Sequence, residues 1–572
     1  MAFGANAIFD VRNGGSDSQC GGAFDPGATT NMSTNGAVTL ATSNGPQFSS
    51  ADYSIQTGDI GAWVYLANGG SGNHAQPGWY QITAQVSGVA TLSAAVGAAY
   101  YTATWGSVTT GRNPSQVSTV AGCSSDNTAT LSSITWTIDY SQQVAAQATG
   151  TATNSSTTLT ATTAIFNKGM VGNFVTDGTT WKEITGYTST TVVTLDSAPS
   201  WTSATIYIGG ALATPGKAGG LKVAGNDILW KYNASAYTLT TASSNVSGGI
   251  VSDTTGGVDQ TNPTWWVGYD TTRTLYNSDA NWPTLNAGSQ NSITLFSITG
   301  QYLRVCNIIV DGNGASTTSS TGFLQSGSYQ KIDHIKAQNC ESHGINLVGG
   351  NGVSAEYLSA TGCSGTCAIR VQTAVCVYAC ESYNNTTHGF LCSAQAHLKN
   401  CISSGNTGAT TYGFKSESVG FVCINCVAYG NGKYGFDGDN SISNSLFVNC
   451  IAEGNGVSAS GGGWSSTAVR PLTRLVNCAG YNNTGGNYST TNILDVTNFI
   501  AQSAGSFFTN AAGGDFSLNN TAGRGALLRA TGFPSLFPRG LTANFLDIGV
   551  SQHTDPTKLI IPDGMYGGMQ HC

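Results

Sequence analysis

Residues 421–439 read FVCINCVAYGNGKYGFDGD, and residues 396–417 read AHLKNCISSGNTGATTYGFKSE. In both stretches a Cys precedes an Asn by five residues, and a Gly-Phe pair follows. Short runs of alternating apolar and polar residues, broken by Gly and Asn, are typical of strands joined by tight turns. Neither stretch keeps apolar residues at helical spacing, so a helical repeat is disfavoured.

The same pattern recurs through the second half of the chain as three series in register. The first series is Asn313, Asn339, Asn385, Asn406, Asn431, Asn455 and Asn483, with Gly362 dividing its one long gap. The second is Phe323, Ile345, Ile369, Phe390, Phe414, Phe436 and Trp464. The third is Cys380, Cys401, Cys426, Cys450 and Cys478, each five residues before its Asn. Repetition at this period is typical of a stacked repeat protein.

Strands that repeat at this period predict an all-β fold, a right-handed parallel β-helix in which each coil stacks on the next. We expect each Asn of the first series to form a corner, because Asn tolerates the left-handed conformation. Its amide is expected to hydrogen-bond along the axis. The second series should face inward, since an exposed row of Phe would promote aggregation.

Around this repeat the sequence predicts five segments. They are an N-terminal arm or attachment segment (1–43), a first small β module (44–143), a linker with a second small β module (144–212), the β-helix (213–496) and a C-terminal cap (497–572). The two modules share a strand pattern, so we expect two copies of one unit. Residues 248–273 are expected to be a long loop from an early coil.

Composition limits the partners of the protein. Only 9% of the 572 residues are charged and the net charge is −8, which disfavours nucleic acid. The first residues lack a signal-peptide pattern, and 18 consecutive apolar residues occur nowhere in the sequence. We therefore expect a protein made in the cytoplasm, with no membrane span.

The sequence contains 15 Cys residues. Because at least five occupy one slot of the repeat, we interpret them as a buried column of free thiols that act as small apolar side chains. Disulfides and a metal site are the alternatives. Paired Cys and His spacing typical of zinc ligands is missing, so we predict no metal and no cofactor.

The chain resembles a large class of right-handed β-helix proteins of the pectate-lyase-like type. The resemblance lies in AIFDVRNGGSDSQCGGAFDPG (7–27), GGLKVAGNDILWKYNASAYTLTT (219–241), IIVDGNG (308–314), DFSLNNTAGRGALLR (515–529) and LDIGVSQH (546–553). Many such proteins are virion or tail-spike proteins of tailed phages. The resemblance implies a homotrimer, attached to other virion proteins through the N-terminal arm and directed at host glycans.

Outward residues beside the second series are the candidates for chemistry. If Phe414 and its equivalent in the next row face inward, alternation turns the first and third following residues outward. Lys415 then lies beside Asp437, and Glu417 beside Asp439, one rung or about 5 Å apart. Two carboxylates at this distance match the pair of a retaining glycosidase, and each raises the pKa of the other.

The alternative is a solvated outer strand with one Lys–Asp pair. We favour it because the neighbouring rungs place Ser393 and Thr467 in the same column, so the acidic patch does not extend. Lys415 and Asp437 are then candidates for contact with a glycan.

Other polar and aromatic residues are weaker candidates. His343 and His388 share one position of the repeat, but Tyr residues fill it in the next two rows, which disfavours a metal site. Trp265 and Trp266 can stack on sugar rings or cover the mouth of the helix. Their large apolar area favours the second role.

The sequence therefore predicts a structural and adhesive protein of a phage virion, which presents a rigid β-helix to host glycans. A polysaccharide depolymerase that acts through Glu417 and Asp439 is the first alternative. A bacterial surface protein is the second, and the missing signal peptide counts against it.

Overall fold

The computed structural model shows an all-β chain with 5% helix, in two compact units. Unit 1 comprises Met1–Tyr237 and Ser243–Thr284, and unit 2 comprises Thr238–Ala242 and Leu285–Cys572. The residues that the structure describes are 8–12, 17, 33–39, 47–60, 62–66, 78–92, 130–139, 146–152, 156–166, 170, 173–177, 179–208, 211–269, 279–314, 320–372, 375–393, 395–417, 420–438, 445–458, 461–465, 473–489, 493, 495–529, 531–532 and 547–550.

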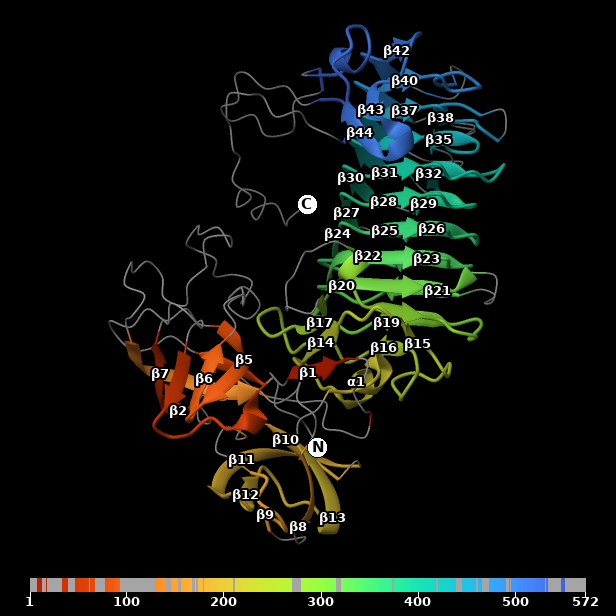
Figure 1. The fold of residues 1–572 in the computed structure, drawn as a ribbon. Helices are drawn as coiled ribbons and strands as arrows, with labels where there is room; N and C mark the ends of the chain where they lie inside the picture. Colours follow the sequence, from red (N-terminus) through yellow and green to blue (C-terminus); the bar gives the residue numbers. More distant parts are fainter. Residues whose placement is uncertain are drawn as a thin grey trace. The chain divides into compact units, whose positions relative to one another are not determined.

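Unit 1 contains two closed antiparallel barrels (Figure 1). The first has β2 (Ser33–Thr39), β3 (Gln47–Ser50), β4 (Trp63–Leu66), β5 (Gly78–Val86), β6 (Val89–Leu92) and β7 (Thr130–Asp139), in the order β2-β3-β6-β5-β4-β7. The second has β8 (Ala146–Ala152), β9 (Thr158–Ala161), β10 (Phe174–Thr176), β11 (Trp181–Ser189), β12 (Val192–Leu195) and β13 (Trp201–Ile208), in the order β10-β11-β12-β9-β8-β13. Both rings connect equivalent strands in the same cyclic order, as expected for two copies of one unit.

The rest of unit 1 contains parallel strands and one short helix. It contains β1 (Ile8–Val11), α1 (Pro215–Leu221), β14 (Asp227–Lys231), β16 (Val251–Asp253) and β17 (Thr264–Tyr269); β15 (Tyr237–Thr238) and β18 (Thr284–Asn286) contain residues of both units. β1 pairs in parallel with β14, which pairs in parallel with β17.

These pairings change two expectations from the sequence. The predicted N-terminal arm contains a strand of the helix, β1, and a strand of the first barrel, β2. The predicted loop at 248–273 contains β16 and β17. The short apolar runs in both segments signal strands, but the partner of β1 lies far away in sequence, whereas β2 pairs with the nearby β3 and β17 with β14.

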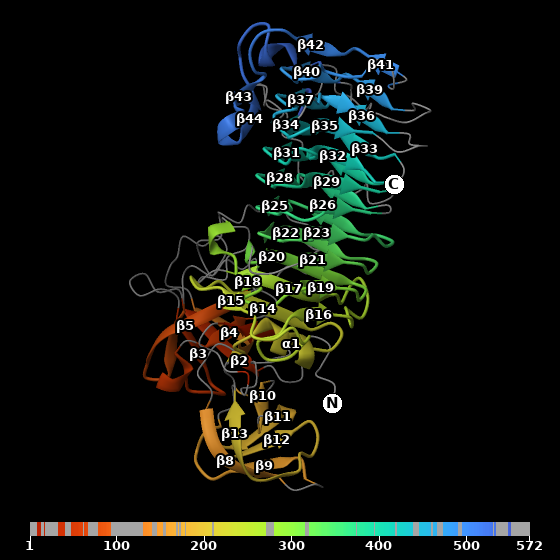
Figure 2. The same cartoon turned by 90° about the vertical axis from the view of Figure 1, so that its right-hand side faces the viewer.

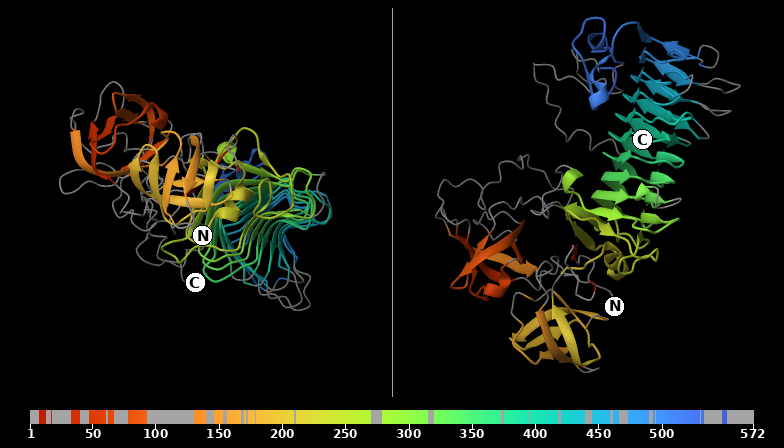
Figure 3. Two further views of the ribbon diagram at one scale, coloured as in Figure 1. Left: turned by 90° about the horizontal axis from the view of Figure 1, so that it is seen from below. Right: turned by 45° about the vertical axis from the view of Figure 1, so that its right-hand side comes forward.

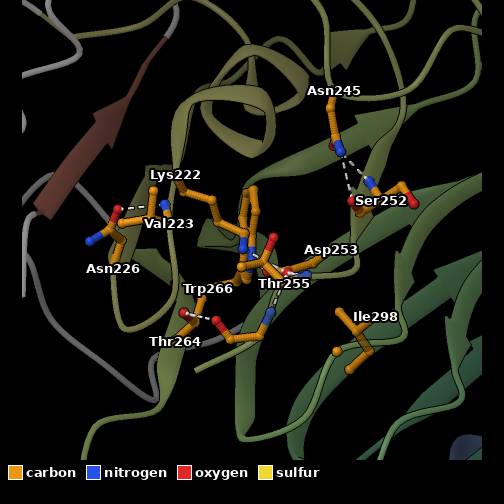
Figure 4. A network of polar contacts seen from close by, with 12 residues as sticks. Lys222, Val223, Asn226, Asn245, Ser252, Asp253, Thr255, Thr264, Trp266 and Ile298 are labelled. Atoms are coloured by element: carbon orange, nitrogen blue, oxygen red, sulfur yellow. Dashed lines mark hydrogen bonds and ion pairs between the residues drawn. The ribbon is translucent and has the colours of Figure 1, made fainter. Parts of the chain in front are cut away.

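A buried polar network connects the end of α1 with β16 and β17 in this part of unit 1 (Figure 4). The Lys222 ammonium lies 2.7 Å from Asp253 Oδ1, and both side chains are almost fully buried. The indole N–H of Trp266 donates to Asp253 Oδ2 at 2.7 Å. Because each buried charge has an opposite charge or a hydrogen-bond donor beside it, desolvation of the pair is offset.

Unit 2 is the body of a right-handed parallel β-helix with about 8 turns, as predicted. Its first sheet has β20 (Leu303–Asp311), β22 (Lys331–Gln338), β24 (Ser354–Glu356), β25 (Ser359–Thr361), β27 (Cys376–Tyr378), β28 (Glu381–Tyr383), β30 (His397–Lys399), β31 (Ile402–Ser404), β33 (Val422–Ile424), β34 (Val427–Tyr429), β36 (Leu446–Val448), β37 (Ile451–Glu453), β39 (Arg474–Val476), β40 (Ala479–Tyr481), β41 (Asp495–Thr497) and β42 (Ile500–Gln502). Its second sheet has β19 (Thr294–Ile298), β21 (Thr321–Gln325), β23 (His343–Leu347), β26 (Cys367–Val371), β29 (His388–Cys392), β32 (Tyr412–Ser416), β35 (Tyr434–Asp437) and β38 (Trp464–Ser465). Figure 2 shows the strands of both sheets stacked from rung to rung, and Figure 3 shows the coils superimposed from below.

The interior of unit 2 follows two of the predicted series. Phe390, Phe414, Phe436 and Trp464 are at most 1% exposed and stack with centroids 4.8 to 5.2 Å apart. The described Cys residues are free, and all but Cys376 are buried. The thiol column therefore replaces apolar wall residues, as the sequence predicted.

The Asn series combines two positions of the repeat. Asn313 and Asn339 have the predicted left-handed backbone. In later rungs the left-handed residue is the one before the Asn of the series: Asn384, Gly405, Gly430, Gly454 and Asn482. The corner prediction is therefore wrong for the later members of the series. Their side chains point into the helix, because a residue that follows the corner is turned inward.

The inward Asn side chains form the predicted hydrogen-bonded ladder. Nδ2 of Asn385, Asn406, Asn431 and Asn455 each donates to Oδ1 of the next member at 2.8 to 2.9 Å. The four are fully buried. The hydrogen bonds of these buried amides therefore come from the protein itself: from the next rung, and within the same rung from Ser382 Oγ for Asn385 and Ser403 Oγ for Asn406.

The described part of the C-terminal segment covers the side of the helix. β43 (Phe508–Asn510) and β44 (Asp515–Leu518) form a hairpin. The segment packs onto outward residues of the first sheet in a cluster of Val427, Ile451, Ala479, Phe507, Phe508, Phe516, Leu518, Leu528 and Ile548. These residues cover apolar side chains on a flank, and Phe499 of the predicted cap packs against Trp464, the last residue of the inward series, with ring centroids 5.4 Å apart.

Replacement of one ladder amide should destabilise the fold. Asn406→Ala removes the acceptor of Asn385 and leaves buried polar groups without partners, so we expect a loss of about 1–3 kcal/mol in unfolding free energy. Chemical denaturation of the whole protein measures this loss in unfolding free energy. Thr407→Ala, at an exposed neighbour, is the control. Equal stability of the two variants would contradict the structural role of the ladder.

Replacement of a buried carboxylate under the C-terminal segment should stabilise the protein. Glu453 Oε2 accepts the backbone N–H of Phe507 at 3.0 Å, and burial raises the pKa of Glu453 more than its hydrogen bonds lower it. The protonated form of Glu453 therefore contributes its full stabilisation below the unfolded pKa of about 4.3. This contribution is lost as the pH rises through the folded pKa and the buried side chain becomes charged.

Glu453→Gln should accordingly raise the melting temperature at pH 7 and weaken its decline above pH 4.3. Thermal melts between pH 4 and pH 8 measure both effects, with the half-buried Glu341→Gln as the control. A lower melting temperature for Glu453→Gln at pH 7 would refute this assignment.

Candidate functional site

The candidate site lies on the outer side of the second sheet of unit 2. Strand pairing places Asn346, Arg370, Leu391, Lys415 and Asp437 in one column, each one rung from the next. The predicted neighbourhood of Lys415 and Asp437 is thus found in the register. Asp437, however, is only 4% exposed, so its proposed contact with a glycan is corrected.

Glu417 leaves β32 and pairs with an Arg two rungs away. Arg370 Nη2 and Nε donate to its two carboxylate oxygens at 2.5 and 3.1 Å, and Ser393 Oγ donates to Oε2 at 2.5 Å. Burial pulls the pKa of Glu417 upward, but the hydrogen bonds and the Arg370 charge outweigh it, so the net shift is downward. Glu417 is therefore an oriented anion and a poor proton donor. Its proposed partner, Asp439, lies outside the described residues.

A second column runs beside the first one. His343 pairs with Cys367, which pairs with His388, and the next two rungs place Tyr412 and Tyr434 in the same position. The Tyr412 and Tyr434 rings stack with centroids 5.8 Å apart. The His residues therefore share their slot with Cys367 and with two Tyr residues, in the register that the sequence repeat predicted.

Two ammonium groups lie over these rings. Lys415 Nζ is 5.1 Å from the Tyr412 centroid and 3.2 Å from His388 Nε2. Lys433 Nζ donates to the Tyr412 hydroxyl at 3.2 Å and lies 5.6 Å from the Tyr434 centroid. We call His388, Tyr412, Lys415, Lys433 and Tyr434 the basic–tyrosine stripe. All five side chains are half-buried, so each has a fixed position and an accessible part.

The stripe suits binding better than proton transfer. Cation–π contacts orient both ammonium groups. An ammonium group oriented in this way is a hydrogen-bond donor for the hydroxyl or carboxylate oxygens of a ligand. Burial and the nearby Lys415 lower the pKa of His388 to about 4, so the ring is neutral at pH 7. Among the described residues, no three His, Cys, Asp or Glu side chains are grouped to hold a metal ion.

The Trp candidates lie in unit 1. Trp266 is fully buried and its indole N–H is bonded to Asp253, so its role as a glycan-facing residue is corrected. Trp265, its neighbour on β17, is half-buried. Alternation along one strand explains why two adjacent Trp residues have different environments. No described helix has the length and hydropathy required to cross a membrane.

The sequence did not identify Arg370 and Lys433 as residues of the site. It also did not identify Ser393 as a hydrogen-bond donor to Glu417. Arg370 had a signal, because it follows the inward Ile369 just as Lys415 follows Phe414. Its ion pair with Glu417 spans 47 residues of sequence and two rungs, so spacing along the chain does not reveal it. Lys433 lies just before β35, and its direction depends on the corner.

No protein-family model matches the sequence, and no curated protein matches it either. Solved structures with similar folds include pectate lyase Pel9A, at 15% identity and a TM-score of 0.45, covering 60% of this chain and 92% of that one. Geobacillus virus E2 ORF18 has 10% identity and a TM-score of 0.31, covering 48% and 52%. The catalytic domain of a GH87 α-1,3-glucanase solved with nigerose has 11% identity and a TM-score of 0.26, covering 82% and 86%.

The depressed pKa of His388 predicts acid sensitivity. The unfolded chain takes up a proton near pH 6.5 and the folded chain only near pH 4, so stability should fall as pH falls through this window. His388→Tyr keeps an aromatic ring of the kind found in the next two rungs and removes the titration.

The melting temperature of the His388→Tyr variant should therefore depend less on pH between 6.5 and 4 than that of the wild type. Differential scanning calorimetry measures the slope, and His397→Tyr, at an exposed His, is the control. An unchanged slope in His388→Tyr would contradict the assignment.

Proposed function

We propose that this protein binds surface polysaccharides of a bacterial host and serves as an adhesive component of a tailed-phage virion. The observation that carries the glycan-binding part is the basic–tyrosine stripe. It combines oriented ammonium groups with aromatic rings on a rigid sheet, and sugars offer hydroxyls and apolar C–H faces that match both. The virion role and the homotrimer rest on the sequence resemblance.

A depolymerase is the second candidate, favoured only by the position of Glu417 beside the stripe. A retaining mechanism needs an ionised nucleophile and a separate protonated acid. The Arg370 pair keeps Glu417 ionised, which suits the first role and not the second.

Binding to an array of bacterial capsule and lipopolysaccharide glycans tests the proposal. We expect the wild type to bind at least one glycan, and the Lys415→Ala, Lys433→Ala double variant to bind it at least tenfold more weakly. Lys217→Ala removes a cation on α1 of unit 1 and is the matched control, so it should bind as the wild type does. Wild-type protein that binds no glycan, or a double variant that binds normally, would overturn the proposal.

The same glycans separate adhesion from depolymerisation. Release of new reducing ends that disappears in Glu417→Gln would establish the enzyme. Immunogold labelling of phage particles tests the virion role on its own, and unlabelled particles would refute it while leaving glycan binding intact.

A further inference from the structure

The first sheet of unit 2 carries strained aromatic residues at a corner. In the later rungs the residue between its two short strands has a left-handed backbone and is Asn400, Asn425, Asn449, Asn477 or Asn498. In two early rungs the same position holds His334 and Tyr357, with φ of 51° and 53°. A left-handed backbone costs an ordinary residue about 1–2 kcal/mol, whereas Asn adopts it more readily.

A second pair of aromatic residues repeats this feature just before β20 and β22. Tyr302 and Tyr329 have φ of 55° and 56°, and their rings stack 5.2 Å apart at 10°. Tyr329 and His334 are five residues apart on one bent strand, a separation of at most about 16 Å. One extended ligand can therefore contact both pairs.

The rings do not serve the core. Tyr329 and Tyr357 are 39% and 47% exposed. The His334 and Tyr357 rings stack 4.8 Å apart, and Tyr378 meets Tyr357 edge to face at 6.0 Å. Such contacts contribute about 0.5–1.5 kcal/mol, which is close to the cost of the backbone strain. Stability alone therefore does not account for aromatic residues at these corners, and strained residues are concentrated at functional sites.

The surroundings indicate the chemistry of the ligand. Strand pairing places Asp333, Glu356, Tyr378 and Lys399 in the column beside the corner. Two acids, an aromatic ring and a cation follow one another in this column, and the buried Asp333 pairs with the His334 ring, whereas the centre of a protein interface is depleted of charge. A sugar offers a C–H face for the rings and hydroxyls for the carboxylates. Because the column has no excess of positive charge, a neutral sugar fits it better than an acidic one.

We propose that Tyr329, Tyr357 and Tyr378, with the Glu356 carboxylate, bind a neutral oligosaccharide. This surface belongs to the other sheet from the basic–tyrosine stripe, and the proposal goes beyond the function assigned to the stripe. The ring of Tyr357 supplies the central contact, because it is the most exposed of the three and lies between His334 and Tyr378.

Substitution by Asn separates a binding role from a structural one. Tyr357→Asn and Tyr329→Asn remove a ring and install the residue that relaxes a left-handed corner. We expect an unchanged or higher melting temperature for both variants. A structural role for the rings predicts the opposite, because the stacks would be lost.

The binding measurement uses an array of neutral glucan, mannan and galactan oligosaccharides, followed by calorimetry with the best ligand. The wild type should bind at least one of them, and each Tyr→Asn variant should bind it at least tenfold more weakly. Ala379→Asn, at the same corner one rung further along, is the matched control and should keep full binding. The Lys415→Ala, Lys433→Ala double variant should also keep it.

Four results would overturn the proposal. They are wild-type protein that binds no neutral oligosaccharide, Tyr→Asn variants that bind normally, Tyr→Asn variants that melt at lower temperature than the wild type, and loss of binding in the double Lys variant. The last result would place all glycan binding at the stripe, so the proposed function would stand while the second site would not. If instead the double Lys variant bound its glycan normally while the Tyr→Asn variants lost binding of the neutral oligosaccharide, the second site would stand and the proposed role of the stripe would not.

Discussion

The register of this β-helix depends on hydrogen bonds between buried amides. Each inward Asn of the ladder donates to the next, and Asn385, Asn431 and Asn455 also donate to backbone carbonyls at 3.0 to 3.2 Å. A slip of one residue in any coil would leave these groups unpaired in the core, at a cost of about 1–3 kcal/mol for each group. The ladder thus aligns every column on the outside. Both proposed surfaces are columns of this kind, so their geometry is a consequence of the interior.

The repeat made the fold predictable, and the limits of prediction lie at its corners. Spacing identified the column of Asn406 and Asn431, the inward Phe414 and Phe436, and the thiol column. Spacing does not distinguish a corner residue from the one after it, because both recur with the same period. The left-handed residue is Gly405 or Gly430 in these rungs, and backbone angles were needed to show it. β1 was missed for another reason, since its partner β14 lies more than 200 residues away in the chain.

The sequence predicted only those features of the candidate site that follow from strand alternation and from the pairing of successive rungs. The neighbourhood of Lys415 and Asp437 follows from alternation and was correct. The burial of Asp437 and the capture of Glu417 by Arg370 were missed, because both depend on side-chain directions and on residues in other rungs. Tyr357 and Tyr329 also fell outside the prediction. Only the presence of Tyr357 at a position that Asn holds in later rungs would have signalled this surface in the sequence.

The first sheet of unit 2 shows how one scaffold divides its outer face. In the later rungs the outward residues Ile402, Val427 and Ile451 are apolar, and the C-terminal segment packs against them. In the earlier rungs the same column holds Ile309, Lys336, Ser359 and Glu381, so it is no longer a continuous apolar strip. The described C-terminal residues pack where burial stabilises the fold and leave the charged rungs out of their apolar cluster. Among the described residues, the aromatic corners at Tyr302, Tyr329, His334 and Tyr357 all precede the rungs that the C-terminal segment covers, which is the arrangement expected if this half of the face is reserved for a ligand.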